Sequence, residues 1–210
     1  MKHLQWEIER MSSMRVPTFT LTLPDWIDEE IPETSHRFTS VESRMALVTH
    51  LAKVNVQQAG GPFAAAVFNL ETQELVAPGV NLVVPLRASI AHAEIVAVTL
   101  AEQVLGHFTL NGPDLPSCEL VTSTEPCAMC LGAIPWAGVR RLVCGAREAD
   151  ALAIGFDEGP KPADWQTALK VRGIDVVQDV GRDANIEVLQ AYVRAGGMMY
   201  NGATIISMDS

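Results

Sequence analysis

The 210-residue chain lacks any long hydrophobic run and any recognisable leader. No stretch of about 18 consecutive apolar residues is present, so nothing in the sequence predicts a membrane-spanning helix. Residues 1–14 carry scattered charges and contain no apolar segment of the kind that a secretory signal needs. From these two absences we expect a cytoplasmic protein without a membrane partner.

Basic residues are also scarce. Lys and Arg number 15 against 25 Asp and Glu, which gives a net charge of −10, and Arg140-Arg141 is the one adjacent basic pair. Such a surface repels the phosphate backbone of nucleic acids unless a local basic patch forms. We therefore expect a small uncharged substrate and no nucleic-acid partner.

Cysteine is limited to four residues, Cys118, Cys127, Cys130 and Cys144. In a chain of this length without a secretory signal, cysteines favour metal binding or catalysis over a disulfide framework. Hydrophobic residues make up 48% of the chain, enough for a large globular core.

The proline spacing divides the chain into two parts. Residues 1–36 contain Pro17, Pro24 and Pro32, which prevent a long helix, and are expected to form an N-terminal extension. Its apolar residues are expected to pack on the domain formed by residues 37–210; they are Phe19, Leu21, Leu23, Trp26 and Ile27.

Hydrophobic periodicity predicts an α/β domain. The first helix is expected over 40–55, with Thr39 and Glu42 as a capping box. Strands 63–70 and 74–83 should form a hairpin. The remaining expected elements are a helix over 92–105, a strand over 118–123, a helix beginning at 127, a strand over 140–146, a short helix over 151–156, a strand over 174–180 and a helix over 186–195. A hairpin followed by alternating strands and helices predicts a three-layer α/β/α fold around a mixed sheet of about five strands.

The stretch "TEPCAMC" holds two cysteines three residues apart. At that spacing, Cys127 and Cys130 share one face of a helix. In the first helical turn, the positive end of the helix dipole favours the thiolate that a metal requires. A redox pair remains an alternative, and so does a structural zinc site with a fourth ligand drawn from Cys118, Cys144, His50 or His107.

The stretch "AHAE" offers a third ligand, since His92 also stands at an expected helix start. Three protein ligands leave the fourth position of Zn²⁺ for water, which is the catalytic arrangement. Glu94 is then the candidate proton carrier. Helical spacing alone does not place Glu94 beside the metal, because residues two apart point in different directions.

Together, "HAE" and "PCAMC" resemble the signature of zinc-dependent nucleobase deaminases of the cytidine deaminase superfamily. The segments "GGPFAAAV", "GVN", "AHAE", "EPCAMCLGAIPWA" and "AIGFDE" are similar to those of its guanine deaminase branch. The resemblance spans about residues 40–160. It implies the cytidine-deaminase-like fold, one Zn²⁺ per chain and a homodimer.

The resemblance also implies the chemistry, in which an activated water replaces the purine amine and guanine becomes xanthine and ammonia. Glu94 would carry the proton, and Glu158 of "GFDE" would recognise the base and help to move protons, with Asp157 as its substitute. The resemblance implies substrate-binding roles for Asn81, the backbone of Ala93, Phe63 and Trp136. Alternatives are a guanine-like ring such as an aminated s-triazine, adenosine in tRNA, or a zinc-stabilised binding protein without turnover.

Overall fold

A computed structural model describes residues 18–33 and 36–201 of the chain. Its five strands are β1 (Ala64–Asn69), β2 (Leu75–Val80), β3 (Cys118–Thr124), β4 (Arg141–Ala146) and β5 (Asp175–Val177). Its helices are α2 (Ile27–Glu30), α3 (Val41–Gln57), α4 (Val83–Leu86), α5 (Ala93–Leu105), α6 (Ala128–Ala137), α7 (Glu148–Ala153), α8 (Trp165–Val171) and α9 (Arg182–Arg194).

The strands form one mixed sheet in the order β2-β1-β3-β4-β5. Strand β1 is antiparallel to both β2 and β3, whereas β3, β4 and β5 run parallel to one another. The predicted hairpin and the mixed five-stranded sheet are therefore confirmed.

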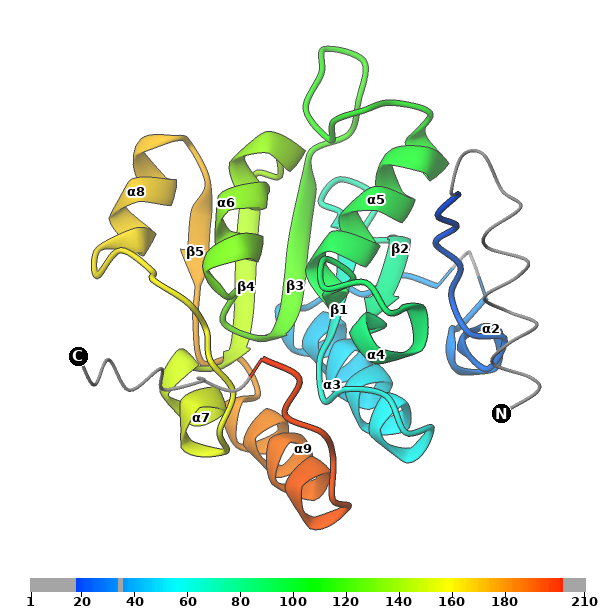
Figure 1. Cartoon of the computed structure of the whole chain (residues 1–210). Helices are drawn as coiled ribbons and strands as arrows, with labels where there is room; N and C mark the ends of the chain where they lie inside the picture. The colour runs from blue at the N-terminus through cyan, green and yellow to red at the C-terminus, as the bar shows by residue number, and fades with distance from the viewer. Residues whose placement is uncertain (1–17, 34–35, 202–210) are drawn as a thin grey trace.

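Helices cover both faces of the sheet, which makes the three predicted layers (Figure 1). Alternate residues of β1 face opposite cores: Ala64, Ala66 and Phe68 pack with α3, whereas Ala65 and Val67 pack with α5 and α6. Helix α9 joins α3 on the first face, and α8 joins α5 and α6 on the second. Both faces of the central strands are thus buried.

Helix α3 begins one residue later than the predicted capping box. The cap is Ser40, whose hydroxyl accepts from the Ser43 amide, while the Ser43 hydroxyl accepts from the Ser40 amide. The expected pair Thr39 and Glu42 was therefore wrong by one position. Thr and Ser are both favourable N-cap residues, so the sequence alone did not show whether Thr39 or Ser40 caps the helix.

Four of the five apolar residues predicted to pack on the domain do so. Ile27 is only 2% exposed, and Leu21, Leu23 and Trp26 are partly buried against the same core. Phe19 is 56% exposed, so its predicted packing was wrong. Residues 1–17 and 34–35 lie outside the described residues, and the division into an extension and a domain stays a prediction.

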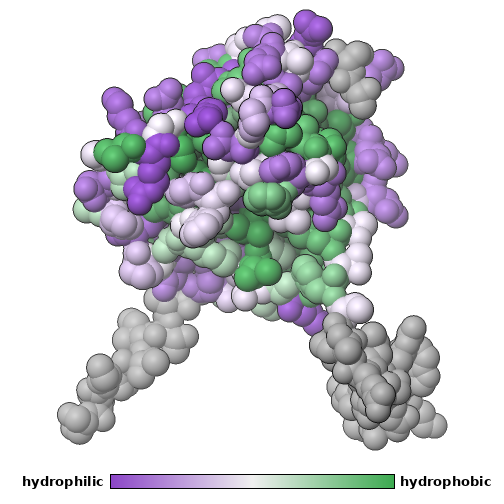
Figure 2. Space-filling view, turned by 90° about the horizontal axis from the view of Figure 1, so that it is seen from above, coloured by the Kyte–Doolittle hydropathy of each residue, from purple (hydrophilic) through white to green (hydrophobic). Residues whose placement is uncertain are grey.

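The surface combines hydrophilic residues with hydrophobic patches, as the face in Figure 2 shows. Phe108, Trp136 and Val171 are among the large hydrophobic side chains that reach the solvent. In the described ranges, no helix is both long enough and apolar enough to cross a membrane.

Candidate metal centre and active site

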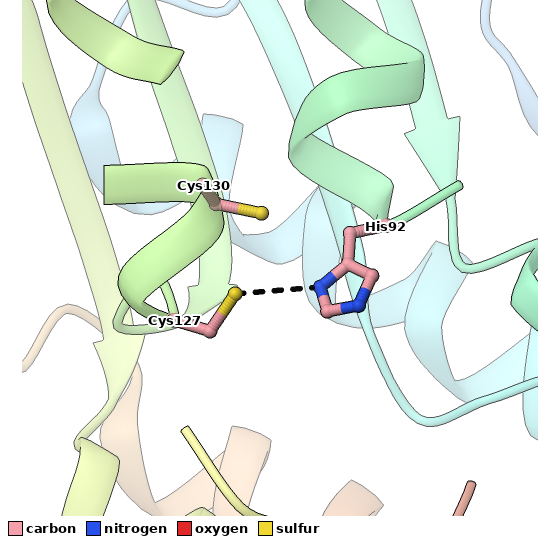
Figure 3. Close-up of side chains that lie close together, drawn as sticks. All are labelled: His92, Cys127 and Cys130. Carbon is pink, nitrogen blue, oxygen red and sulfur yellow. Dashed lines mark hydrogen bonds between the residues drawn. The ribbon is translucent and has the colours of Figure 1, made fainter. Parts of the chain in front are cut away.

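Two helix N-termini meet at one point of the fold. His92 is the N-cap of α5, Cys127 is the N-cap of α6, and Cys130 lies in the first turn of α6. One ligand atom from each lies within 4.8 Å of the others, and the Cys127 Sγ is 3.5 Å from the His92 Nδ1. The three side chains point toward one another (Figure 3).

This donor set fits Zn²⁺. Zinc takes sulfur at about 2.3 Å and imidazole nitrogen at about 2.0 Å, so tetrahedral ligand atoms stand roughly 3.5–4 Å apart. The 3.5 Å between the Cys127 Sγ and the His92 Nδ1 lies in this range. Cys118, Cys144, His50 and His107 do not join the group, which contains three residues in the described part of the chain. A zinc ion held by these three residues would have its fourth position free for solvent or substrate.

The electrostatics of the group favour a thiolate at Cys127. The hydrogen bond from Cys130 and the contact with His92 lower the pKa of the Cys127 thiol to about 4, against the effect of burial. Burial alone would lower the pKa of His92, but the hydrogen bond to Cys127 and the nearby carboxylates raise it. Cys130 is buried beside Cys127, and its pKa is raised.

Two carboxyl groups face this centre from different elements. Glu94 lies in the first turn of α5 and is 7% exposed; Glu158 lies in the loop after α7 and is 6% exposed. Burial, then the negative charge at Cys127, raises the pKa of Glu94. The same two causes, together with Glu94, raise the pKa of Glu158 to about 8. Glu158 is thus suited to hold and release a proton near neutral pH, and burial favours the protonated form of Glu94 as well.

A small cavity of about 20 Å³ joins these groups. Its walls include His92, Cys127, Glu94 and Glu158. Asn81, just after β2, and Phe63, just before β1, line the same cavity. Such a volume holds about one water molecule and is smaller than a purine.

The C-terminal part of the described chain closes the cavity. The Tyr200 hydroxyl accepts a hydrogen bond of 2.8 Å from the Asn81 side-chain amide. The Asp157 amide donates to the Asn201 carbonyl at 3.2 Å, and the Asn201 side-chain amide donates to the Asp157 carbonyl at 2.7 Å. The Tyr200 hydroxyl thereby occupies the side-chain amide of Asn81 inside the cavity.

Three predicted substrate-binding residues do not line this cavity. Ala93 is fully buried, and its carbonyl packs so closely on Gly79 that a Cβ there would lie 2.3 Å away. Asp157 is exposed, and its carboxylate accepts the Gly159 amide. Trp136 is 86% exposed and lines a separate groove between α6 and α8.

Other cavity residues were missed by the sequence analysis. They are Thr122, Thr124, Glu125, Tyr200 and Asn201. Glu125 stands within the "TEPC" motif, so its position next to the metal ligands was a usable signal. Tyr200 carried no such signal, because it meets Asn81 across 119 positions of sequence.

Comparison with known proteins gives one family and several relatives. A family model described as the cytidine and deoxycytidylate deaminase zinc-binding region matches residues 39–146. The guanine deaminase of Bacillus subtilis is 39% identical over 114 residues, which cover 51% of this chain and 69% of the relative. The tRNA-specific adenosine deaminase of Agrobacterium fabrum is 41% identical over 64 residues, covering 30% of this chain and 39% of the relative.

Solved structures extend the likeness over most of the chain. The guanine deaminase of Nitrosomonas europaea superposes with a TM-score of 0.80 at 45% identity, covering 86% of this chain and 98% of that one. A similar structure in complex with 2,6-diaminopurine has a TM-score of 0.82 at 46% identity, covering 88% of this chain and 97% of that one.

Proposed function

Because the chain belongs to the cytidine and deoxycytidylate deaminase zinc-binding family, and is similar to guanine deaminases over most of its length, we propose that it hydrolyses guanine to xanthine and ammonia. The observation that carries the proposal is the pair of buried carboxyls, Glu94 and Glu158, which face one cavity beside the three candidate ligands. A binding protein without turnover has no need of two such groups.

His92, Cys127 and Cys130 would hold one Zn²⁺ per chain. When bound there, Zn²⁺ lowers the pKa of water and so makes an attacking nucleophile available near neutral pH. Glu94 would accept one proton of this water and pass it to a ring nitrogen. It would then take up the remaining proton of the added hydroxyl and pass it to the departing amine. Burial raises the pKa of Glu94, which favours the uptake of each proton. The balance is guanine plus water to xanthine plus ammonia.

Asn81 and Glu158 would orient the base. The Asn81 amide can donate to a ring acceptor once Tyr200 has released it, and Glu158 can accept from a ring or amine N–H. Phe63 contributes an aromatic wall that is held edge-on by Phe156, with ring centroids 4.9 Å apart. These groups match a flat heterocycle that carries both donors and acceptors.

The enclosed cavity favours a free base over a nucleotide in tRNA. A flipped nucleotide needs an open approach for its flanking phosphates, and a net charge of −10 opposes it. An aminated s-triazine offers similar donors and acceptors, so this second ring belongs in the same assay.

Ammonia release from a panel of compounds tests the proposal: guanine, guanosine, adenine, cytosine, cytidine, adenosine and an aminotriazine. Release from guanine well above the rest is the expected result. Release from adenosine or cytidine instead of guanine would retain the metal chemistry and overturn the proposed substrate. A zinc-loaded chain that is silent on the whole panel would overturn the proposed activity.

A further inference from the structure

A lysine with a buried side chain, Lys161, connects the loop that carries Glu158 to the neighbouring Glu125–Pro126 segment. This loop runs from Ile154 to Asp164, between α7 and α8, and Lys161 lies three residues after Glu158. The Lys161 side chain is only 3% exposed. A lysine is almost never fully buried unless it is paired.

Lys161 contacts the segment that precedes and holds the metal-site cysteines. Its Nζ donates to the Pro126 carbonyl at 3.1 Å and lies 3.7 Å from the Glu125 carboxylate. Glu125 is itself buried, accepts the Glu148 amide at 3.0 Å and also lines the cavity. The ammonium thus joins the Glu158 loop to the residues immediately before Cys127.

Two further contacts complete the attachment. The Glu148 carboxylate on α7 lies 3.2 Å from the Lys161 Nζ, and the Trp165 ring of α8 lies beneath it, with 5.5 Å to the ring centroid. In the opposite direction, the Ala128 amide of α6 donates to the Glu158 carbonyl at 2.8 Å. The loop is therefore held at Glu158, and again three residues later at Lys161, by the segment that contains Cys127.

We propose that Lys161 is a positioning residue, whose ammonium fixes the 154–164 loop on the Glu125–Pro126 segment so that the Glu158 carboxyl stays in the cavity. Lys161 does not line the cavity and acts through Glu158. The inference rests on the proposed function where it concerns turnover of guanine. Its structural half, the attachment of the loop, can be measured without turnover.

A double-mutant cycle on guanine turnover tests the link between the two residues. Lys161→Met should lower kcat/KM by about 10- to 100-fold with the zinc content unchanged, because small misplacements of a catalytic group have effects of this size. The double variant Lys161→Met/Glu158→Gln should have a kcat/KM within about threefold of that of Glu158→Gln alone, because both changes act on the same carboxyl. If the double variant instead lost kcat/KM by the product of the two single-variant factors, the positioning role would be overturned. Loss of zinc in Lys161→Met would overturn it as well.

Hydrogen exchange of the loop amides separates this inference from the proposed function. In Lys161→Met, the backbone amides of residues 154–159 should exchange at least about tenfold faster than in the wild type. The matched control is Lys170→Met, which removes an exposed lysine from α8 and should leave exchange and activity unchanged. Unchanged loop exchange in Lys161→Met would overturn the attachment, whether or not the protein acts on guanine.

Discussion

At the residue scale, two adjacent carboxylates have opposite environments. Glu158 is buried in the cavity, whereas Asp157 is exposed and caps the turn to Gly159 through a hydrogen bond of 2.8 Å. Burial and the neighbouring negative charges raise the pKa of Glu158 to about 8. The structure therefore favours Glu158 over Asp157 as the second functional carboxylate.

Replacing each of these carboxylates by its amide tests the choice. Glu158→Gln should lower kcat/KM for guanine by about 100-fold, within the range for loss of a proton-transferring group. Asp157→Asn is the matched control and should stay within about threefold, because surface substitutions have small effects and Asn keeps the oxygen that accepts the Gly159 amide. The reverse order of effects would assign the role to Asp157.

The cysteines offer a second comparison of this kind. Cys127→Ala should reduce bound zinc well below one per chain and lower the thermal midpoint, because metal binding is coupled to folding. Cys144→Ala removes a fully buried thiol from the middle of β4 and should keep the zinc. Metal analysis and thermal unfolding of both variants provide the measurement. Full zinc content in Cys127→Ala would contradict its place among the ligands.

At the scale of elements, the sequence predicted the helices that hold the site well. The starts of α5 and α6 follow from "AHAE" and "PCAMC", where a cap residue precedes an apolar run, and the structure brings these two starts together. Trp136 was misplaced because it stands six residues beyond Cys130. At about 100° per residue it lies about 240° around the helix, facing away from the site.

Short helices within proline-rich segments were not predicted. Helix α2 precedes Pro32, α4 contains Pro85, and α8 follows Pro162; each has four to seven residues. Such elements are too short to show periodicity and depend on tertiary packing, as Trp165 and Leu169 of α8 illustrate. The closure of the site by Tyr200 was equally inaccessible, because only the folded chain brings it to Asn81.

The link between α7 and α9 predicts a pH dependence. Two hydrogen bonds from Arg182, at 2.8 and 2.9 Å, hold the pKa of Asp150 below its usual value. A lowered pKa means stability that is present above the unfolded pKa of about 3.9 and is lost as pH falls through the folded pKa.

Asp150→Asn should therefore destabilise the protein at pH 7 by about 1 kcal/mol, allowing for partial exposure of the pair. The difference from the wild type should shrink as pH falls below 4. Urea unfolding at pH 7 and pH 3 provides the comparison, with the exposed Asp114→Asn as control. A difference that stays constant across this range would contradict the assigned ion pair.

At the scale of the whole molecule, the N-terminal segment belongs to the stability of the domain. Residues 18–33 place Ile27, Leu21 and Leu23 on the core beside α3. A chain that begins at Arg37 should lose at least about 2–3 kcal/mol of unfolding free energy, the scale of one buried Ile side chain. Urea unfolding of this chain and of one that begins at Pro17 would measure the loss. Equal stability would show that residues 17–36 are dispensable.

The quaternary state follows from the resemblance alone and stays a prediction. A homodimer is expected, and sedimentation equilibrium of the zinc-loaded chain would measure it directly. A monomer at all concentrations would remove dimerisation from the account. It would not change the site, because the three candidate ligands, both buried carboxyls and Asn81 lie in one chain.

The most direct test of the central claim is xanthine formation from guanine by the wild type and Glu94→Gln, with zinc per chain measured on the same samples. The wild type should form xanthine, and the variant should keep its zinc and the fold while losing at least about 100-fold in rate, as expected for the proton carrier. A zinc-loaded Glu94→Gln variant that forms xanthine at the wild-type rate would contradict the assigned chemistry.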